Sequence, residues 1–583
     1  MYDMYDLILK NCRIVDGTGA PWYRGDVAVK DGRIAKIGCI TDAGHVSGQA
    51  LRNSGDADAW HVSGQTLRNS GDADAGHVSG QASEAGAAGS SGPSSAQCAA
   101  AAEVVDCEDL YLAPGFIDIH SHSDETIAKY PRNESRILQG VTTELTGNCG
   151  LSTVPVSADP EKAELLSSYV AGTDTSVTSV AELAEHLEKD VKPSTNIALG
   201  VGHGSLRIAA MGFDDRVPEK SEMDKMKGLL RESLEEGAFY MSTGLIYPPG
   251  IFAATDEITE LAKILPEYGA FYATHMRNEG DRLIKAVVEA ITIAEKSGAP
   301  LEISHHKALR RANWGKVRES TAIIEEARNR GIDVRCDQYP YTATATTLDS
   351  NVPNWAFEGG VKKMLARLRD PETRQRLVDE SNENHKGRWQ DISVAYAESD
   401  DLRWTQGLDM VTIADKMGTD PASACFDILL GTDDKAGEVD RAICEDDVQF
   451  VMQKPYVMIG SDGNALSLEG GTVPHPRSFG TFVRVLCRYA RDLKLFSLEE
   501  GVRKMTSMPA ARMGLQDRGL IKEGFAADMV LFDYYALKDT PTYKDPIAVC
   551  EGIRRVYVNG TLTAKDGQHT GARAGKVLRR GKD

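Results

Sequence analysis

The feature that most constrains the fold is a regular alternation of short apolar segments and longer amphipathic segments through the middle of the chain. The apolar segments read as buried strands, and most are followed by a segment with an apolar period of roughly 3.6 residues that ends at glycine. The eight strand-like segments lie at 115–122, 141–148, 196–203, 238–247, 271–277, 301–307, 333–341 and 456–463. Eight strands separated by helices predict an α/β fold of the (β/α)8 TIM-barrel type over 114–505. The long interval before the last strand predicts a helical insertion over the barrel mouth, at about 343–450.

The two ends of the chain have a different pattern. Short alternating segments closed by Asp-Gly or Pro-Gly turns occupy 1–41 and 101–113, and the same pattern returns in 506–583. Such segments are typical of antiparallel strands joined by tight turns. We therefore expect the two ends to form one small, discontinuous β-sandwich domain.

Residues 42–100 interrupt the N-terminal part of this domain with a 16-residue repeat. The sequence HVSGQ recurs at His45, His61 and His77, and RNSGDADA recurs at Arg52 and Arg68. Each repeat unit offers only one or two apolar positions, too few to bury a core against its neighbours as a solenoid would. We expect a disordered or loosely ordered low-complexity insertion, whose histidines belong to a solvated linker rather than to a metal site.

The composition disfavours several classes of partner. The 583 residues carry a net charge of −20, which argues against binding to nucleic acid or other polyanions. No run of about 18 apolar residues occurs and the N-terminus lacks the pattern of a signal peptide, so we expect a cytoplasmic protein without a membrane partner. The ten cysteines include no CxxC pair, which favours reduced thiols. A small-molecule substrate remains the expected partner, and the sequence leaves the oligomeric state open.

Side chains that can bind metals follow five of the predicted strands. The set comprises His120, His122, Cys149, His275, His305 and Asp462. Each one alone reads at least as well as a hydrogen-bonded core histidine, a small buried thiol or a turn aspartate, and for the cysteine and for His275 and His305 taken singly that reading is favoured. Together they would meet at the C-terminal rim of one barrel, where catalytic groups sit. Imidazole, thiolate and carboxylate form a ligand set that suits zinc.

Longer motifs carry a family resemblance. The segments APGFIDIHSHSD, QGVTTELTGNCG, ISHHK, HPRSFGTF and GLIKEGFAADMVLFD resemble the N-acyl-D-amino-acid deacylase (D-aminoacylase) family of the amidohydrolase superfamily, and the resemblance covers most of the chain outside the repeat. Related hydantoinases and dihydroorotases place a carboxylated lysine after strand four, but here that strand ends STGLIYPPG, with no lysine. A cysteine after strand two is the deacylase substitute, so Cys149 indicates the deacylase branch.

The resemblance implies a zinc site with one tightly bound ion, held by Cys149, His275 and His305. It also implies a second metal position, weaker or vacant, which Cys149 could bridge and which is surrounded by His120, His122 and Asp462. The family pattern Ser-His-x-Lys selects His305 over His306, which we expect to pack behind the ligands. We expect His203, in the motif GHG, to shape its loop without binding metal.

The chemistry implied by the resemblance is amide hydrolysis. Zinc lowers the pKa of bound water from about 15.7 toward 7 and polarises the amide carbonyl. Asp462 would accept the proton of the attacking water and pass it to the leaving nitrogen, although a turn-forming aspartate before glycine is the local alternative. The family motifs place Lys307, Tyr339 and Arg477 around the α-carboxylate of the substrate. The loops after strands four and seven, with Tyr247, would set side-chain specificity.

The expected function is zinc-dependent hydrolysis of an N-acyl-D-amino acid to a carboxylate and a free D-amino acid. A dipeptidase or another small-amide hydrolase would keep the same metal site and remains an alternative. A non-catalytic barrel that serves as a scaffold is a third reading, which the retention of all six ligand-type residues disfavours. Preference for D over L substrates rests wholly on the resemblance. Bulky Phe239 and Tyr240 in strand four depart from the expected pattern and leave the shape of the pocket open.

Overall fold

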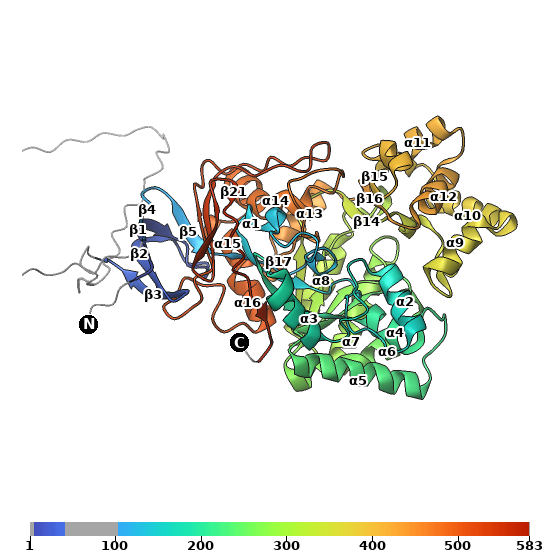
Figure 1. Ribbon diagram of the computed structural model, residues 1–583, viewed down its shortest axis with the longest axis horizontal. Coiled ribbons are helices and arrows are strands. Elements are labelled where there is room, and N and C mark those ends of the chain that lie inside the picture. The colour runs from blue at the N-terminus through green and yellow to red at the C-terminus, as the bar shows by residue number, and fades with distance from the viewer. Residues whose placement is uncertain (1–4, 41–102, 582–583) are drawn as a thin grey trace, which may run out of the picture.

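The computed structural model describes residues 5–40 and 103–581 (Figure 1). The repeat predicted as an insertion at 42–100 lies outside the described residues. In Figure 1 the two ends of the chain, coloured blue and red, form one side of the molecule, and the green helices of the middle segment form the other.

Eight parallel strands run through the middle of the chain, one in each segment that the sequence predicted. They are β6 (Phe116–Asp118), β7 (Val141–Thr146), β8 (Asn196–Leu199), β10 (Tyr240–Gly244), β11 (Phe271–His275), β12 (Leu301–Ile303), β13 (Val334–Gln338) and β17 (Val457–Ile459). Strands β6, β7 and β8 pair in parallel, and a short strand β9 (Val201–Gly202) begins a second parallel series through β10, β11, β12, β13 and β17. Just beyond β6 and β17, Ser121 and Gly463 form a parallel bridge.

Helices predicted from the apolar period connect these strands. Helices α5 (Lys220–Glu236) and α7 (Leu283–Ser297) both end at a glycine in the left-handed conformation, Gly237 and Gly298, which only glycine adopts without strain. Their buried residues join the strand side chains in one large apolar cluster. The other helices outside 343–450 are α1 (Glu134–Ile137), α2 (Pro160–Tyr169), α3 (Val180–His186), α4 (His203–Met211), α6 (Thr255–Ala262), α8 (Val317–Asn329), α14 (Arg477–Arg484), α15 (Leu498–Lys504) and α16 (Ser507–Met513).

The bulky pair in strand four is accommodated by a glycine in the neighbouring strand. A Cβ atom on Gly200, between β8 and β9, would lie 1.9 Å from Cε1 of Tyr240. The phenol therefore fills the place of the missing side chain, and its hydroxyl donates to the Thr146 carbonyl at 3.2 Å. The bulky Tyr240, unexpected in strand four, is therefore accommodated because residue 200 is a glycine and leaves room for the ring.

Strands from both ends of the chain join in one nine-stranded sheet. Its members are β1 (Leu7–Ile14), β2 (Tyr23–Lys30), β3 (Arg33–Gly38), β4 (Glu103–Asp106), β5 (Tyr111–Pro114), β18 (Met529–Phe532), β19 (Ile553–Val558), β20 (Thr561–Lys565) and β21 (Gln568–His569). The antiparallel pair β5–β18 links the N-terminal strands to the C-terminal strands. A sandwich arrangement of this sheet stays a prediction. Two pieces of 506–583 lie outside it: helix α16, and strand β22 (Val577–Leu578), which pairs in parallel with β8.

The insertion at 343–450 contains a small sheet as well as helices. Strands β14 (Thr344–Thr347), β15 (Ile392–Ala397) and β16 (Ala436–Asp440) pair antiparallel, with β16 in the centre. The helices are α9 (Val361–Arg369), α10 (Pro371–Asn384), α11 (Met410–Met417), α12 (Pro421–Thr432) and, following the sheet, α13 (Glu445–Met452). The insertion has an apolar cluster of its own. The expectation of a purely helical insertion was therefore incomplete.

Within residues 5–40 and 103–581, no helix combines the length and the apolar character that crossing a membrane requires.

Candidate metal centre and active site

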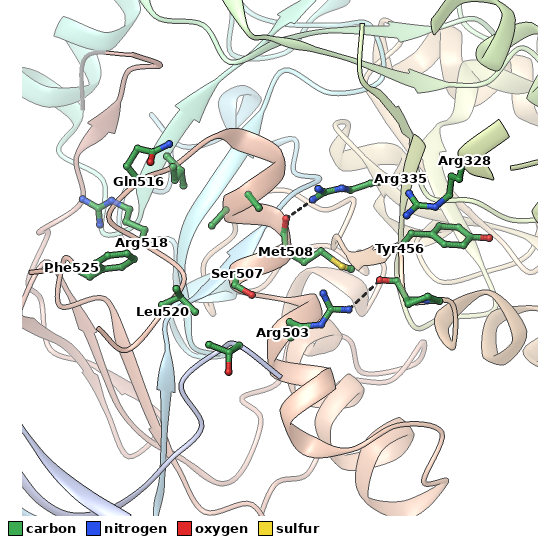
Figure 2. A pocket seen from close by; sticks show the side chains of 15 residues that line it. Arg328, Arg335, Tyr456, Arg503, Ser507, Met508, Gln516, Arg518, Leu520 and Phe525 are labelled. Atoms are coloured by element: carbon green, nitrogen blue, oxygen red, sulfur yellow. Dashed lines mark hydrogen bonds between the residues drawn. The ribbon is translucent and has the colours of Figure 1, made fainter. Parts of the chain in front are cut away.

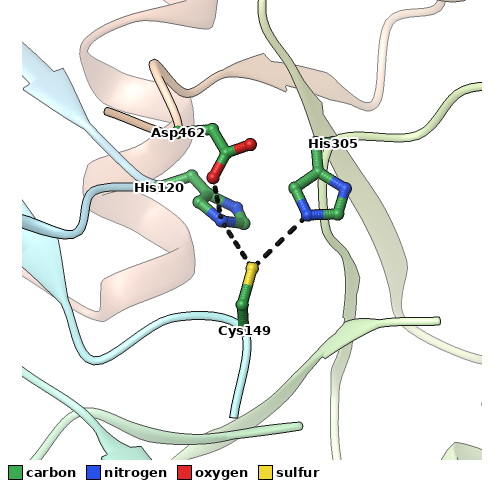
Figure 3. A group of neighbouring side chains, drawn as sticks. All are labelled: His120, Cys149, His305 and Asp462. Carbon is green, nitrogen blue, oxygen red and sulfur yellow. Dashed lines mark hydrogen bonds and ion pairs between the residues drawn. The ribbon is translucent and has the colours of Figure 1, made fainter. Parts of the chain in front are cut away.

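Four of the predicted ligand residues meet just beyond the C-terminal ends of the parallel strands. Ligand atoms of His120, Cys149, His305 and Asp462 all lie within 4.8 Å of one another, and all four side chains are buried (Figure 3). The Cys149 sulfur is 3.3 Å from Nε2 of His120 and 3.4 Å from Nε2 of His305. Oδ1 of Asp462 is 3.4 Å from Nε2 of His120. The thiol therefore lies between two imidazoles that come from strands far apart in the sequence.

Three of these four residues have a strained backbone. Cys149, His305 and Asp462 have φ angles of 52°, 34° and 54°, in the left-handed region that residues with a side chain seldom adopt. Each is the second or third residue after the end of a strand, in a turn that redirects the chain and aims the side chain at the common centre. Such strain persists only where the surroundings hold it, and it gathers at functional sites.

The turn that carries Cys149 is packed against the end of β10. A Cβ atom on Gly150 would lie 2.2 Å from the backbone nitrogen of Gly244, and one on Gly244 would lie 2.0 Å from the Cys149 carbonyl oxygen. Glycine at both positions lets the two backbones touch. The motif GNCG is therefore explained by close backbone approach as well as by its cysteine.

A second group shares His305 with the first. His275, Glu279 and His305 have ligand atoms within 4.8 Å of one another, and all three are buried. The rings of His275 and His305 lie 4.5 Å apart between centroids. Neither ring nitrogen of His275 has a hydrogen-bond partner among the described residues. Its Nε2 lies 3.5 Å from Oε2 of Glu279. A buried imidazole without a hydrogen bond to either nitrogen, beside a carboxylate and a second imidazole, fits a metal ligand, and the N, S and O donor set fits zinc.

The other histidines of the predicted rim differ in position. His122 lies 3.1 Å from Oδ1 of Asp462 through Nε2, but it is not part of either group. His306 points away from the centre, and its Nε2 lies 2.9 Å from the Ser320 hydroxyl of α8. His203 is the first residue of α4, and its Nε2 lies 2.9 Å from the Glu257 carboxylate. His306 and His203 thus lie away from the metal-binding groups.

Two buried carboxylates that the sequence reasoning missed orient the ligand residues. Asp337, at the end of β13, lies 3.2 Å from Nδ1 of His120 and accepts the backbone N–H of His305 at 2.8 Å. Glu279 lies 3.1 Å from Nδ1 of His305 and accepts from Lys307 Nζ at 2.6 Å. Glu279 follows a predicted strand in the motif MRNEG, so a strand-end signal was present for it, whereas Asp337 lies in the middle of the predicted strand 333–341. A carboxylate partner fixes the ring orientation and tautomer of a metal-binding histidine.

The electrostatic environment favours the ionised form of Cys149, Asp462 and Glu279. Burial opposes ionisation of Cys149, but the His120 and His305 imidazoles hold the pKa of its thiol well below the ordinary value. Burial likewise opposes charge on Asp462, yet the Arg477 guanidinium, with His305, holds its pKa well below the ordinary value. For Glu279, burial is outweighed by Lys307, which lowers the carboxyl pKa. Thiolate and carboxylate are the forms that bind a cation.

The residues expected to bind the substrate carboxylate gather around one aromatic ring. Lys307 Nζ lies 5.8 Å and the Arg477 guanidinium 5.1 Å from the centroid of Tyr339. The Tyr339 hydroxyl is buried and has no hydrogen-bond partner among the described residues. Lys307 is paired with Glu279, and Nη1 of Arg477 donates to Asp462 at 2.6 Å. Both cations are thus already engaged with carboxylates of the site.

A cavity of about 360 Å³ opens over this centre. Its walls include His275, His305, Lys307, Tyr339 and Asp462 from the strand ends. Tyr247 also lines it, with its ring 4.8 Å from that of His275. The insertion contributes the opposite wall through β14, β16 and the segment after β14. The cavity has the size of a small-molecule site, and it is built by both the parallel strands and the insertion.

Comparisons with known proteins agree with this arrangement. Residues 103–564 match the amidohydrolase family. The chain is 32% identical to a D-aminoacylase from Alcaligenes xylosoxydans xylosoxydans, over 99% of this chain and 98% of the relative. It is 31% identical to an N-acyl-D-glutamate deacylase of the same organism, over 100% of this chain and 98% of the relative.

Solved structures give the same result. A D-aminoacylase crystal structure has a TM-score of 0.74 at 31% identity, covering 99% of this chain and 100% of the other. The N-acyl-D-glutamate deacylase of Bordetella bronchiseptica, solved with zinc and a phosphonate inhibitor that mimics the tetrahedral intermediate, has the same TM-score at 30% identity and the same coverage. The chain is a hydrolase that belongs to the amidohydrolase family, within its group of D-aminoacylases and N-acyl-D-amino-acid deacylases.

Proposed function

We propose that this protein is a zinc-dependent deacylase that cleaves N-acyl-D-amino acids to a carboxylate and a free D-amino acid. The observation that carries the proposal is the buried group of His120, Cys149, His305 and Asp462, two of which, His305 and Asp462, line a small-molecule cavity. Relatives of nearly full length are a D-aminoacylase and deacylases of N-acyl-D-aspartate and N-acyl-D-glutamate. Their names supply the substrate class, and the cavity supplies a site of suitable size and charge.

The proposed metal assignment has one strong and one weak position. Cys149, His275 and His305 would hold the tight zinc ion, supported by the contact between Cys149 and His305 and by the lack of a hydrogen bond to either ring nitrogen of His275 among the described residues. The weak position would be bounded by His120, His122 and Asp462, which are linked by the 3.4 Å and 3.1 Å contacts to Oδ1 of Asp462. A related D-aminoacylase is described as having a binuclear centre with one-metal activation and second-metal attenuation.

The proton chemistry of the proposed reaction falls to Asp462. Zinc, when bound, supplies a Lewis acid that lowers the pKa of water and polarises the amide carbonyl. Arg477 binds Oδ2 of Asp462 and leaves Oδ1 directed toward His120 and His122. In this orientation Asp462, held as carboxylate, can take a proton from the attacking water and deliver it to the leaving nitrogen, which departs readily only once protonated.

Binding of the substrate carboxylate would use the Tyr339 side of the cavity. The unpaired Tyr339 hydroxyl can donate one hydrogen bond, and Lys307 and Arg477 flank its ring. Charge-assisted hydrogen bonds from these two cations would fix the α-carboxylate and so orient the scissile amide.

The proposed architecture behind this site is a closed (β/α)8 barrel over 114–505. Support comes from the parallel pairings β6–β7–β8 and β9–β17, and from the bridge between Ser121 and Gly463, where β17 would meet β6. The Asp462 amide also donates to the His120 carbonyl at 2.7 Å. We propose that the insertion covers the mouth of this barrel, and that the described parts of 1–41, 101–113 and 506–583, apart from α16 and β22, form a separate β-sandwich domain.

The proposal is tested with a panel of N-acetyl amino acids in both configurations. Purified zinc-loaded enzyme is incubated with each substrate, and the released amino acid is identified by chiral chromatography. We expect release of D-amino acids and no turnover of the L series. Turnover of both configurations, or of neither, would contradict the proposal. Dipeptides of D-residues are included, because cleavage of these alone would favour the peptidase alternative.

A further inference from the structure

A second cavity lies at the opposite end of the parallel strands. It has a volume of about 520 Å³ and shares no lining residue with the cavity over the metal-binding groups. Arg335 enters it from the start of β13, and Pro455 and Tyr456 enter just before β17 begins. Helix α16 and the segment after it form the other wall. The cavity therefore opens at the N-terminal ends of strands whose C-terminal ends carry the proposed active site.

The charge of this cavity is opposite to that of the chain. The protein carries a net charge of −20, yet the charged side chains that line the cavity are four arginines, at positions 328, 335, 503 and 518. None of the described residues that line it is an aspartate or a glutamate. The charges of two of the arginines are balanced by carboxylates that do not line the cavity. Arg503 donates to Glu500 at 2.6 Å, and Arg518 is paired with Asp528.

Of the other two arginines, Arg335 has only a long ion pair with Asp333, and Arg328 has no carboxylate partner among the described residues. Nη1 of Arg335 donates to the Met508 carbonyl at 3.1 Å, and its Nε lies 3.8 Å from Asp333, beyond hydrogen-bond distance. Arg328 donates to the Val334 carbonyl, and its guanidinium lies 4.8 Å from the Tyr456 ring centroid. Burial, together with the charge of Arg512 and of Arg328, lowers the pKa of Arg335. Positive charge is thus held at this wall without a carboxylate hydrogen bond to balance it.

The rest of the cavity is largely apolar. Figure 2 shows Arg328 and Arg335 on one side, Leu520 and Phe525 on the other, and Met508 between them. Ala510, Ala511 and Leu515 add further apolar surface. Thr18, Ser507 and Gln516 add polar groups to the lining. A ligand that combines one anionic group with an apolar body would match the arginines and the apolar wall. Inorganic phosphate has an anionic group but no apolar body, and a neutral hydrocarbon has an apolar body but no anionic group.

We propose that this cavity binds a small organic monocarboxylate, with its carboxylate between Arg328 and Arg335 and its short apolar chain against Met508, Leu520 and Phe525. Guanidinium groups bind carboxylates through paired, charge-assisted hydrogen bonds. Burial of the chain adds to the affinity because it removes methylene groups from water. The site is separate from the catalytic cavity and holds whether or not the deacylase function is correct.

The test is calorimetric titration of the zinc-loaded, full-length enzyme with hexanoate. Arg335→Gln and Arg328→Gln should each weaken binding by about tenfold or more, because each removes one charged donor. Arg330→Gln is the matched control, since Arg330 lies just after α8 and is paired with Glu326 away from the cavity. Hexylamine and inorganic phosphate complete the series, and both should bind more weakly than hexanoate.

The hexanoate titrations either support or overturn binding in this cavity. Loss of hexanoate binding in both cavity variants, with retention in the control, supports it. Binding that survives both variants would place the carboxylate elsewhere, including the catalytic cavity, and would overturn it. Absence of binding at millimolar hexanoate, or phosphate binding as tight as hexanoate, would also overturn it. Arg328 is exposed, so its variant remains informative if Arg335→Gln fails to fold.

Discussion

At the scale of single residues, the site depends on the carboxylates that contact its histidine rings and fix their orientation. Strand-end reasoning located the six predicted ligand residues, because a strand period of two and a common rim are readable in the sequence. It missed Asp337, which lies in the middle of a predicted strand, and Glu279, although Glu279 follows one. In the sequence, an aspartate or glutamate that orients an imidazole cannot be told from one that faces water, because the residue type is the same. Only burial and the 3.2 Å and 3.1 Å contacts with His120 and His305 separate the two cases.

The role of Asp337 gives a prediction for metal affinity. In Asp337→Asn the side chain keeps its shape but loses the negative charge beside Nδ1 of His120. Zinc affinity of the weaker position, which His120 bounds, should fall by roughly 10–100-fold, the usual cost of removing such a partner. Competition with a chromophoric chelator measures the affinity, and circular dichroism verifies the fold. Asp333→Asn is the control, because Asp333 precedes the same strand and is half exposed. Parent-like zinc affinity in Asp337→Asn would refute this role.

At the scale of elements, the sequence predicted the parallel strands of the middle segment. It did not predict the small sheet of the insertion or the contact between Gly200 and Tyr240. Apolar periodicity placed every parallel strand of the middle segment. It did not reveal the small sheet of the insertion, because TATT and AGEVD are short and partly polar. The bulky pair at Phe239 and Tyr240 looked like a departure in the sequence. The structure explains Tyr240 by a contact with Gly200, forty residues earlier, which no local pattern reports.

The Gly200–Tyr240 pair is open to a double-variant test. Gly200→Ala places a Cβ 1.9 Å from the Tyr240 ring and should destabilise the protein by about 1–3 kcal/mol or more. Adding Tyr240→Leu should recover part of that loss, since the ring is what the new methyl meets. Urea unfolding of the four proteins gives the coupling energy. Gly228→Ala serves as control, because Gly228 in α5 has no atom within 4 Å of the new methyl. Simple additivity of the two substitutions would disprove the pairing.

Glu438 in the insertion sheet gives a prediction for pH. Burial raises its pKa from 4.5 to about 8. Below pH 4.5 the carboxyl is neutral in both states, and between pH 4.5 and 8 it ionises in the unfolded chain alone. The contribution of Glu438 to stability is therefore full at acidic pH and is lost as the pH rises through 8.

Glu438→Gln should remove this pH dependence. Relative to the parent, the variant should be about 1–3 kcal/mol more stable at pH 8 and little changed at pH 5. Glu398→Gln, at an exposed site of the same insertion, is the control. Unfolding free energies of all three proteins at both pH values measure the effect. A variant that is destabilised equally at both pH values would show that hydrogen bonds from Ser350 and Asn351, rather than burial, dominate.

At the scale of the whole molecule, the C-terminus closes onto the middle of the chain. Strand β22 pairs with β8, about 380 residues earlier in sequence, and Leu578 is buried in the apolar cluster beneath the strands. Arg580 donates to the backbone of Met513 and Gly269. The sequence indicated a C-terminal β domain and could not show that its last strand leaves that sheet, because a two-residue strand has no period.

Leu578 tests whether this closure stabilises the molecule. Leu578→Ala should cost about 2–5 kcal/mol, the usual loss when a leucine in a packed core is truncated. Leu493→Ala should cost little, because that side chain is 41% exposed. Denaturant unfolding of the zinc-loaded proteins compares the two. Equal, small losses in both variants would mean that the C-terminal strand is held loosely.

The most direct test of the central claim is a zinc titration of the metal-free enzyme, followed by activity on an N-acetyl-D-amino acid. The parent, Cys149→Ala and Cys425→Ala are compared, the last because Cys425 is a buried thiol of the insertion. We expect the parent and Cys425→Ala to regain activity at about one zinc per chain, and Cys149→Ala to lose both tight zinc binding and turnover. A Cys149→Ala enzyme that binds zinc tightly and releases D-amino acid at the parent rate would contradict the account.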